Sequence, residues 1–275
     1  MSEHAGSPGP PPDPAALVAL ATEVAARAVA LLRDGLGRAR TAVRTKSTAT
    51  DMVSEMDHAS ERLIVSALLD ARPGDGIVAE EGSDVVGTSG VRWVVDPLDG
   101  TTNYLYDLPG WNVSIAAEDA GGVLAGVVAD GVHREVFTAT RGGGAFRDGA
   151  PIMCTGATDL ARALVGTGFG YDAARRRAQG EVLAGVLPRV RDIRRSGAAA
   201  IDLCWVASGR LDGYFERGLA WWDLAAGGLI ATEAGAVVSS LDGGPMVAGS
   251  VLAAAPGLAV PLRDLLCSLG AQNVP

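Results

Sequence analysis

The sequence predicts a layered α/β fold, in which helices and strands pack against one another in layers. Three observations lead to this prediction. Helix-forming periodicity covers the start of the 275-residue chain, short β-branched runs between glycine-rich turns fill the middle third, and helices alternate with strands after Gly168. The sequence shows no solenoid repeat, and no clear linker separates its two halves. We therefore expect a single domain of two packed halves over residues 15–275.

The first segments divide into a leader and a helix. Residues 1–14 are rich in proline, with glycine and serine, a composition that predicts a disordered leader. Ala15–Arg33 repeats apolar residues at helical spacing and predicts an amphipathic helix. Glu23, Arg27 and Arg33 interrupt its apolar stretch, and the N-terminus lacks the pattern of a signal peptide. We therefore expect neither a membrane span nor export.

Further elements follow from periodicity. A second helix is predicted over Val53–Leu69, with its isoleucine and leucines facing the core and Glu55, His58 and Glu61 facing solvent. Five β-branched runs predict strands at Gly76–Ala79, Val91–Val95, Asn112–Ala117, Val123–Ala129 and Glu135–Thr138. The second half is predicted as helix 173–187, strand 190–194, helix 198–207, strand 211–215, helix 222–233 and strand 236–239.

Composition excludes several classes of function. The formal charge of −9 disfavours nucleic acid and anionic membranes as partners. Cys154, Cys204 and Cys267 are far apart and form no zinc or disulfide pattern, which favours a reducing cytoplasm. With three histidines in the chain, a histidine-rich metal centre is also disfavoured, so any metal is expected to bind to oxygen.

The most informative segment runs from Trp93 to Asn103, where an apolar strand leads into Asp96 and Asp99. Pro97 fixes its own φ angle and Gly100 permits unusual backbone conformations, so the two carboxylates can converge across a tight turn, together with the Leu98 carbonyl. The backbone N–H groups of Gly100 and the two threonines after it suit an anion at a helix start. Taken alone, such a motif is more often an ordinary Asp-Gly turn with a helix cap.

Other acids occur at similar places. Glu80 and Glu81 follow a predicted strand, Asp57 lies in the second predicted helix, and Asp223 starts a helix rich in alanine and glycine. Taken alone, these acids are typical of solvated turns, a polar helix face and a helix N-cap. Together, Glu80, Asp96, Asp99 and Asp223 form an all-oxygen ligand set suited to Mg²⁺. Without a cation, four clustered carboxylates would repel one another.

These segments carry a family resemblance. WVVDPLDGTTNY (93–104) and WDLAAGGLIATEAGA (222–236) resemble the two signatures of the inositol monophosphatase family, and AEEGS (79–83) is similar to its Glu-Glu metal motif. Residues 51–57 match its upstream D-x-V-[ST]-x-x-D motif, and Arg195-Ser-Gly-Ala-Ala-Ala resembles its substrate segment. The match runs in order from about residue 15 to 260.

The resemblance implies an alternating α/β/α/β/α sandwich, a homodimer, two or three Mg²⁺ ions and inhibition by lithium. Carried over by position, Glu80, Asp96 and the Leu98 carbonyl would bind one metal. Asp96, Asp99 and Asp223 would bind the second, with Asp96 as the bridge.

The resemblance also implies roles at the reaction centre. Thr101 and Asp57, together with Glu80, would position and activate the attacking water. The implied substrate contacts are Asp99, Gly100, Thr101, Gly197, Ala199, Glu216 and Asp223. The chain departs from the family pattern at Ala198, where serine or threonine is common, and this removes one hydrogen bond near the substrate.

We therefore expect a cytoplasmic phosphomonoesterase that hydrolyses myo-inositol 1-phosphate to inositol and phosphate by in-line attack of a metal-activated water. Glu216 favours a polyol because a carboxylate accepts hydrogen bonds from hydroxyls. The alternatives within this class are histidinol phosphate, 3'-phosphoadenosine 5'-phosphate and fructose 1,6-bisphosphate. Outside it, the chain could be a regulatory binding protein that keeps the fold.

Overall fold

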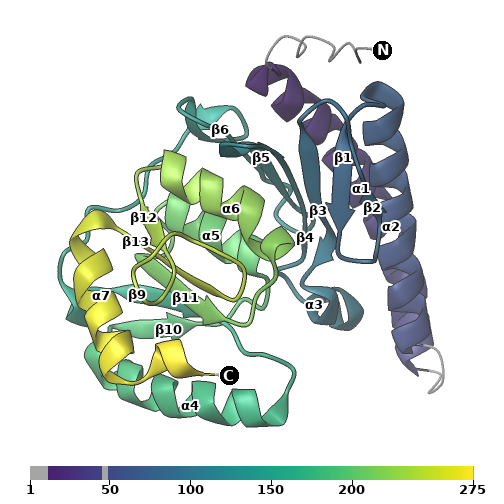
Figure 1. The fold of residues 1–275 in the computed structure, drawn as a ribbon. Helices are drawn as coiled ribbons and strands as arrows, with labels where there is room; N and C mark the ends of the chain where they lie inside the picture. The colour runs from purple at the N-terminus through teal and green to yellow at the C-terminus, as the bar shows by residue number, and fades with distance from the viewer. Residues whose placement is uncertain (1–11, 45–48, 275) are drawn as a thin grey trace, which may run out of the picture.

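The computed structural model describes residues 12–44 and 49–274, with side chains described in 12–36 and 55–274. In this part of the chain, two sheets alternate with three layers of helices (Figure 1). Helices α1 (Pro14–Arg44) and α2 (Ala49–Ala71) cover the outer face of the larger sheet. Helices α5 (Ala199–Ala207) and α6 (Trp221–Glu233) lie between the sheets, and α4 (Ala173–Val186) and α7 (Pro256–Ser268) cover the outer face of the smaller one. The predicted α/β/α/β/α arrangement is confirmed.

The larger sheet has eight strands in the order β2-β1-β3-β4-β5-β6-β7-β8. Their bounds are β1 Gly76–Ala79, β2 Asp84–Val85, β3 Arg92–Asp99, β4 Asn112–Asp119, β5 Gly122–Asp130, β6 Val136–Thr140, β7 Gly144–Arg147 and β8 Ala150–Pro151. Strand β1 pairs in parallel with β3, and the other neighbours are antiparallel. Because β1 and β3 are parallel, their C-terminal ends lie at the same edge of the sheet. Acids follow directly after β1, and β3 itself ends in acids.

The smaller sheet has five strands in the order β10-β9-β11-β13-β12. Their bounds are β9 Leu164–Thr167, β10 Asp192–Arg194, β11 Gly213–Arg217, β12 Val237–Ser239 and β13 Ser250–Ala254. Strand β9 is parallel to β10 and β11, whereas β13 is antiparallel to β11 and β12. The remaining short elements are helix α3 (Thr101–Tyr106) and 3-10 turns at Leu160–Arg162, Leu187–Arg189 and Ala271–Asn273.

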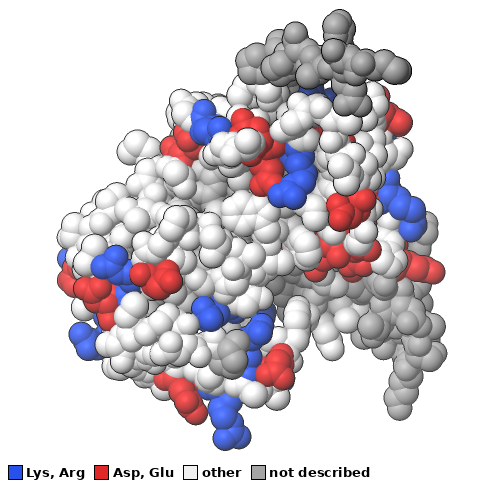
Figure 2. Space-filling view, in the orientation of Figure 1, with Lys and Arg blue, Asp and Glu red and all other residues white. Residues whose placement is uncertain are grey.

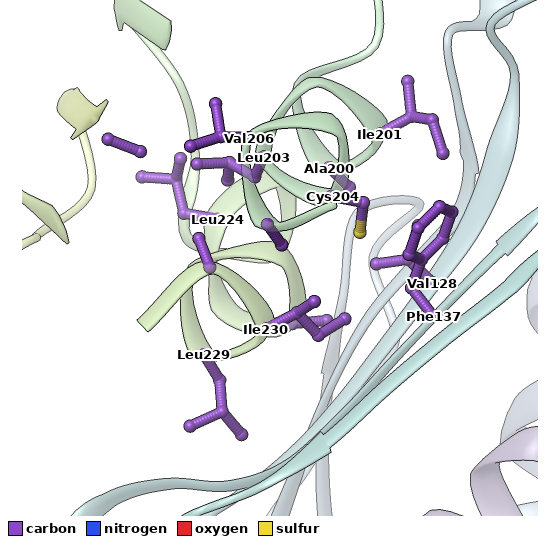
Figure 3. Packing of buried hydrophobic residues seen from close by; sticks show 14 of the residues in the cluster. Val128, Phe137, Ala200, Ile201, Leu203, Cys204, Val206, Leu224, Leu229 and Ile230 are labelled. Carbon is purple, nitrogen blue, oxygen red and sulfur yellow. The ribbon is translucent and has the colours of Figure 1, made fainter. Parts of the chain in front are cut away.

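Three apolar cores hold the layers together. Strand β3 contributes to two of them because its side chains alternate: Trp93 and Val95 pack toward α1 and α2, and Val94 packs toward α5 and α6. Figure 3 shows the middle core, in which side chains of α5 and α6 meet Val128 and Phe137 of the larger sheet. A strand buried on both faces gives a continuous apolar run in the sequence, which is why β3 was recognisable.

Helix α1 is long and apolar enough over Pro14–Leu36 to cross a membrane by length and composition, but a core helix passes the same test. Its apolar face, which includes Leu17, Val24 and Leu32, is buried in the core shared with α2 and the larger sheet. The burial of this face agrees with the amphipathic helix predicted here. The predicted leader falls mostly on residues 1–11, which lie outside the described residues.

One prediction about α2 is wrong. Glu55 and His58 are exposed as predicted, but Glu61 is buried, with 5% of its surface accessible. Its carboxylate accepts hydrogen bonds from the backbone N–H groups of Glu81 (2.8 Å) and Ser83 (3.1 Å) and from the Ser83 hydroxyl (2.6 Å). Periodicity assigns any acid to the solvent face, whereas here three donors stabilise a buried one.

Candidate active site

A pocket of about 290 Å³ opens between the two sheets. It is formed by the ends of β1, β3 and β11, by the starts of α5 and α6, and by the loop after β9. Ten of the predicted site residues line it: Glu80, Asp96, Leu98, Asp99, Gly100, Thr101, Gly197, Ala199, Glu216 and Asp223. Segments more than 140 residues apart in the sequence therefore meet in one cavity, as the resemblance implied.

The two aspartates of the first signature lie within the irregular end of β3, and not in a turn after it as the sequence suggested. The pairing with β4 shifts between Asp96, opposite Ser114, and Asp99, opposite Asn112. The backbone N–H of Leu98 donates to Asp96 Oδ1 at 3.1 Å. This irregularity lets both carboxylates lie on the pocket side, because strict strand alternation would send residues three apart to opposite faces.

Gly100 ends the strand in a left-handed conformation, with φ 84° and ψ 37°, and caps helix α3. A Cβ at this position would lie 2.4 Å from the carbonyl oxygen of Gly110. Both observations require glycine here. The first N–H groups of α3, including that of Thr101, have no partner within the helix and lie beside the pocket.

Asp99 is fixed by two donors on one oxygen. Its Oδ2 accepts hydrogen bonds from Asn112 Nδ2 and from the backbone N–H of Ala200 at the start of α5, each at 2.9 Å. Burial and the charge of Asp223 nevertheless raise the pKa of Asp99 to about 8. The orientation of Asp99 is thus set by two different elements, which leaves Oδ1 available for another ligand.

Asp96 lies between two other acids. Its carboxyl lies close enough to Glu80 and Asp223 for their charges to act on it. Burial and the charges of Glu80, Asp99 and Asp223 raise the pKa of Asp96 well above its usual range. Burial likewise raises the pKa of Glu80 to about 7 and that of Asp223, whose Oδ2 accepts from the backbone N–H of Ala220 at 2.7 Å. Two buried acids, Asp96 and Asp99, with two less buried acids beside them form a site that a cation would stabilise.

Thr101 and Asp57 occupy different positions. The Thr101 hydroxyl lines the pocket and donates to the Leu98 carbonyl at 3.1 Å. Asp57 does not line the pocket but is buried in α2, where burial and the charges of Glu81, Glu80 and Glu61 raise its pKa to about 8. Asp57 is therefore near enough to Glu80 to feel its charge but lies outside the pocket lining.

Glu216 is a further carboxylate in the pocket, in addition to Glu80, Asp96, Asp99 and Asp223. It sits near the end of β11, and its Oε2 accepts a hydrogen bond from the Tyr214 hydroxyl at 2.5 Å. Burial raises its pKa to about 7, against the opposing effects of that hydrogen bond and of the Arg195 charge. A Cβ at Gly168 would lie 1.9 Å from Glu216 Oε2, so a larger residue there would force this carboxylate to move.

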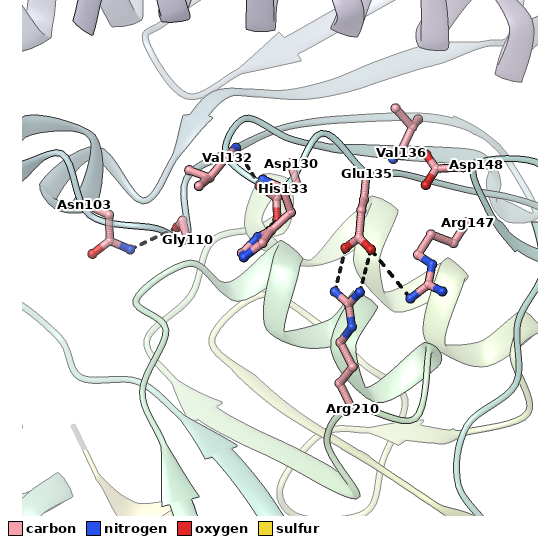
Figure 4. A network of polar contacts seen from close by, with 10 residues as sticks. All are labelled: Asn103, Gly110, Asp130, Val132, His133, Glu135, Val136, Arg147, Asp148 and Arg210. Atoms are coloured by element: carbon pink, nitrogen blue, oxygen red, sulfur yellow. Dashed lines mark hydrogen bonds and ion pairs between the residues drawn. The ribbon is translucent and has the colours of Figure 1, made fainter.

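Ala198 is the N-cap residue of α5 and provides no side-chain cap. Ser196, two residues earlier, donates its hydroxyl to the buried Asp202. Asn103 Nδ2 donates to the carbonyls of Ser196 (2.8 Å) and Gly110 (3.0 Å), and Figure 4 shows the second of these bonds. The substrate segment is therefore held by neighbouring side chains, although a capping residue is missing.

Sequence reasoning missed a basic and aromatic part of the pocket. Arg175, Arg217, Phe169 and Tyr171 line it, alongside Arg195, which belongs to the predicted substrate segment. The loop 168–171 and the run of three arginines at 175–177 lie between the recognisable motifs, and arginines are usually solvent-exposed. The pocket thus combines five carboxylates with three arginines.

Known proteins resemble this chain along most of its length. An inositol-1-monophosphatase of Mycobacterium bovis is 47% identical over 285 residues, covering 96% of this chain and 97% of that protein. A protein of Pasteurella multocida named Nus factor SuhB is 39% identical over 241 residues, covering 86% and 90%. The solved structure of Mycobacterium tuberculosis SuhB has a TM-score of 0.81 at 43% identity and covers 94% of this chain and 98% of its own.

The layered fold, the acidic pocket and these relatives define a phosphatase. Residues 13–270 match the model of the inositol monophosphatase family. The chain belongs to the inositol monophosphatase family.

Proposed function

We propose that the protein is a magnesium-dependent phosphomonoesterase that hydrolyses myo-inositol 1-phosphate to inositol and phosphate. The observation that carries this proposal is the convergence of Glu80, Asp96, Asp99 and Asp223 in one pocket, where burial and their neighbouring charges raise the pKa of Asp96 well above its usual range. Carboxylates held this close together repel one another, so positive charge is stabilised between them. Hard divalent cations prefer such carboxylate oxygens.

The donor set fits magnesium in its chemistry. Glu80, Asp96 and the Leu98 carbonyl would hold one ion, and Asp96, Asp99 and Asp223 would hold a second. The family resemblance implies two or three ions in all. Among the described residues, no three acidic, histidine or cysteine side chains already form a finished coordination shell. The proposal therefore requires cations to draw these carboxylates closer together.

The reaction we propose is an in-line attack of water on phosphorus, with cleavage of the ester P–O bond. Bound magnesium supplies positive charge that polarises the phosphoryl oxygens and stabilises the departing alkoxide. Glu80 and Thr101 line the pocket and would position and activate the attacking water, with Asp57 supporting them from α2. The Thr101 hydroxyl, which donates to the Leu98 carbonyl, keeps its own lone pairs for that water.

Substrate contacts follow the pocket lining. The backbone N–H groups of Gly100 and Thr101 would bind phosphate oxygens. Glu216 would accept hydrogen bonds from the hydroxyls of a polyol, beside Gly197 and Ala199. The same carboxylate could pair with the amine of histidinol phosphate, and 3'-phosphoadenosine 5'-phosphate and fructose 1,6-bisphosphate remain further candidates of the same chemistry.

We also propose a homodimer located in the cytoplasm. A groove of about 780 Å³ lined by Leu108, Pro109, Trp205 and neighbouring residues offers an apolar face for a second copy. All three cysteines are free thiols, which suits a reducing compartment. Light scattering on the purified chain at micromolar concentration tests the dimer, and a monomer would contradict it.

Nucleic acid is not proposed as a partner. The relative named Nus factor SuhB raises the question, but this chain carries a formal charge of −9. Figure 2 shows acidic and basic side chains interspersed in small groups on one face of the molecule, without a broad basic surface. Binding to nucleic acid depends on such a surface.

Phosphate release from the four candidate substrates, with Mg²⁺, with chelator and with Li⁺, tests the proposed function. We expect metal-dependent release that is fastest with inositol 1-phosphate and is inhibited by Li⁺. A preference for histidinol phosphate would change the substrate and leave the site assignment intact. Absence of release from all four would favour a regulatory binding protein.

A further inference from the structure

Asp223 differs from the other proposed metal ligands because it lies on helix α6, whereas they lie on or directly after β1 and β3. It is the third residue of α6. Its Oδ2 accepts the backbone N–H of Ala220, the N-cap residue, at 2.7 Å, so the carboxylate follows the position of the first helical turn. An ion shared by Asp96 and Asp223 therefore requires β3 and the start of α6 to keep a fixed relative position.

Close packing fixes the middle of α6. A Cβ at Gly126 of β5 would lie 3.0 Å from Ala226 Cα, and a Cβ at Gly227 would lie 3.0 Å from the carbonyl oxygen of Ala200 in α5. These contacts lie about one turn beyond Asp223. The first N–H groups of a helix have no partner within it, and helix ends fray unless other groups hold them. The position of Asp223 thus depends on what holds the start of α6.

A buried glutamate of β4 binds this first turn. The Oε2 of Glu118 accepts the indole Nε1–H of Trp221, the first residue of α6, at 2.9 Å. Its Oε1 accepts from the Arg92 guanidinium, with Nε at 2.8 Å. Arg92 lies directly opposite Glu118, at the start of β3. Glu118 therefore connects the strand that carries Asp96 to the helix that carries Asp223.

A second side chain of β4 contacts the same turn more weakly. Ser114, on the same face of β4 as Glu118, donates its hydroxyl to the Trp222 carbonyl at 3.4 Å, which is long for a hydrogen bond. A hydrogen bond to a charged acceptor is stronger. Of the two contacts, the bond between Glu118 and Trp221 is therefore the one that holds the start of α6 against the larger sheet.

We propose that Glu118 is a positioning residue for the second metal site: through Trp221, it holds the first turn of α6 where Asp223 can share an ion with Asp96. This inference rests on the proposed metal-dependent function and adds to it a residue outside the pocket lining. Groups that orient metal ligands from outside the coordination shell commonly change metal affinity by about 10- to 100-fold when they are removed. Because Glu118 acts on the helix and not on the ligand itself, we expect an effect of about 10-fold.

Trp221→Phe tests the proposal, because phenylalanine can keep the aromatic packing against the middle core and lacks the indole N–H. Isothermal titration calorimetry of Mg²⁺ into chelator-treated protein measures metal affinity without the reaction. We expect the Kd of one binding step to rise by about 10-fold, since Asp223 would bind one of the two ions. In phosphate release, the Mg²⁺ requirement should rise by a similar factor, and the KM for inositol 1-phosphate at saturating Mg²⁺ should stay within about 2-fold of the wild type.

Variants of Glu118 show whether the two residues act as a pair. Glu118→Met keeps the length of the side chain and removes both acceptors, so it should weaken Mg²⁺ binding as Trp221→Phe does. The double variant should bind Mg²⁺ as each single variant does, because all three lack the same hydrogen bond. Glu118→Gln keeps one acceptor oxygen and should restore part of the affinity.

Asp119→Asn is the matched control, because Asp119 follows Glu118 on β4 and its carboxylate accepts from Arg141 at 2.9 Å. It should keep the wild-type Mg²⁺ affinity, and circular dichroism should show every variant folded. Variants of Glu118 and Trp221 that lower Tm but bind Mg²⁺ as the control does would overturn the positioning role while the proposed function stands. A wild-type protein that binds no Mg²⁺ and releases no phosphate would instead contradict the proposed function.

Discussion

Replacing Glu61 by glutamine tests whether the turn after β1 positions a metal ligand. Glu61 is buried in α2 and accepts three hydrogen bonds from Glu81 and Ser83, which flank the turn directly after Glu80. A glutamine keeps one carbonyl oxygen, so it can retain the two bonds from Ser83. Its amide N–H₂ then faces the N–H of Glu81, and that bond is lost.

The magnitude follows from this bond. Loss of a hydrogen bond to a charged acceptor costs about 1.5–3 kcal/mol. The lost repulsion between Glu61 and Asp57 offsets part of the cost. We expect a net loss of about 2 kcal/mol and a Tm lower by about 4–6 °C. Since a misplacement of about 1 Å in a catalytic group can cost about 100-fold in rate, kcat/KM should fall by about 10- to 100-fold.

The assay is phosphate release from inositol 1-phosphate at increasing Mg²⁺. If Glu61 acts through the position of Glu80, the variant should need more Mg²⁺ for half-maximal rate, and high Mg²⁺ should recover part of the activity. Glu55→Gln is the matched control, because Glu55 is exposed on the same helix. The reasoning is refuted if Glu61→Gln shows the Mg²⁺ dependence and rate of the control.

The remaining predictions concern the site itself. Asp96→Asn should lower turnover by at least about 1,000-fold while circular dichroism stays unchanged, and wild-type rates would sink the mechanism. Glu216→Gln should raise the KM for inositol 1-phosphate by about 5- to 10-fold with a smaller effect on the Mg²⁺ dependence, because one hydroxyl acceptor is weakened; an unchanged KM would remove Glu216 from the substrate contacts. Ala198→Ser should raise stability by about 1 kcal/mol, seen as a higher Tm, since a serine N-cap accepts from a free backbone N–H of α5; a lower Tm would show that the hydroxyl does not fit. In chelator, Tm should fall as pH rises from about 5 to 8.5, because the raised pKa values of Glu80 (about 7) and Asp99 (about 8) mean that the folded state binds more protons than the unfolded state. Mg²⁺ should restore more stability at the alkaline end, where these acids are ionised, and a Tm that rises with pH in chelator would contradict the assigned burial.

Much of the fold was predictable because burial leaves a periodic trace. Strand β1 agrees with the predicted bounds, and α4, α5 and α6 agree within one or two residues. Strand β9, strand β13 and helix α7 were missed. The two strands have 4 and 5 residues and contain glycine or alanine, so the signals that separate a strand from a buried helix turn are weak. Helix α7 has 13 residues, but Pro261 lies inside it, and an interior proline argues against a helix.

The acidic half of the site was predictable, and the basic half was not. Charged residues are rarely placed next to buried apolar strands unless they have a function, so Glu80 and Asp96 stood out in the sequence. The positions of Glu61 and Arg175 depend on which partners surround them after folding. The sequence pattern does not reveal that the Glu61 carboxylate is buried with three hydrogen-bond donors. Nor does it reveal that the Arg175 guanidinium lies beside Gly218 in the pocket lining.

The most direct test of the central claim is the initial rate of phosphate release from inositol 1-phosphate by the full chain, measured with Mg²⁺, after addition of chelator and after Mg²⁺ is restored. The account predicts release with Mg²⁺, its loss in chelator and its recovery when the metal returns. Release that persists unchanged in chelator would contradict the assignment of Glu80, Asp96, Asp99 and Asp223 as metal ligands.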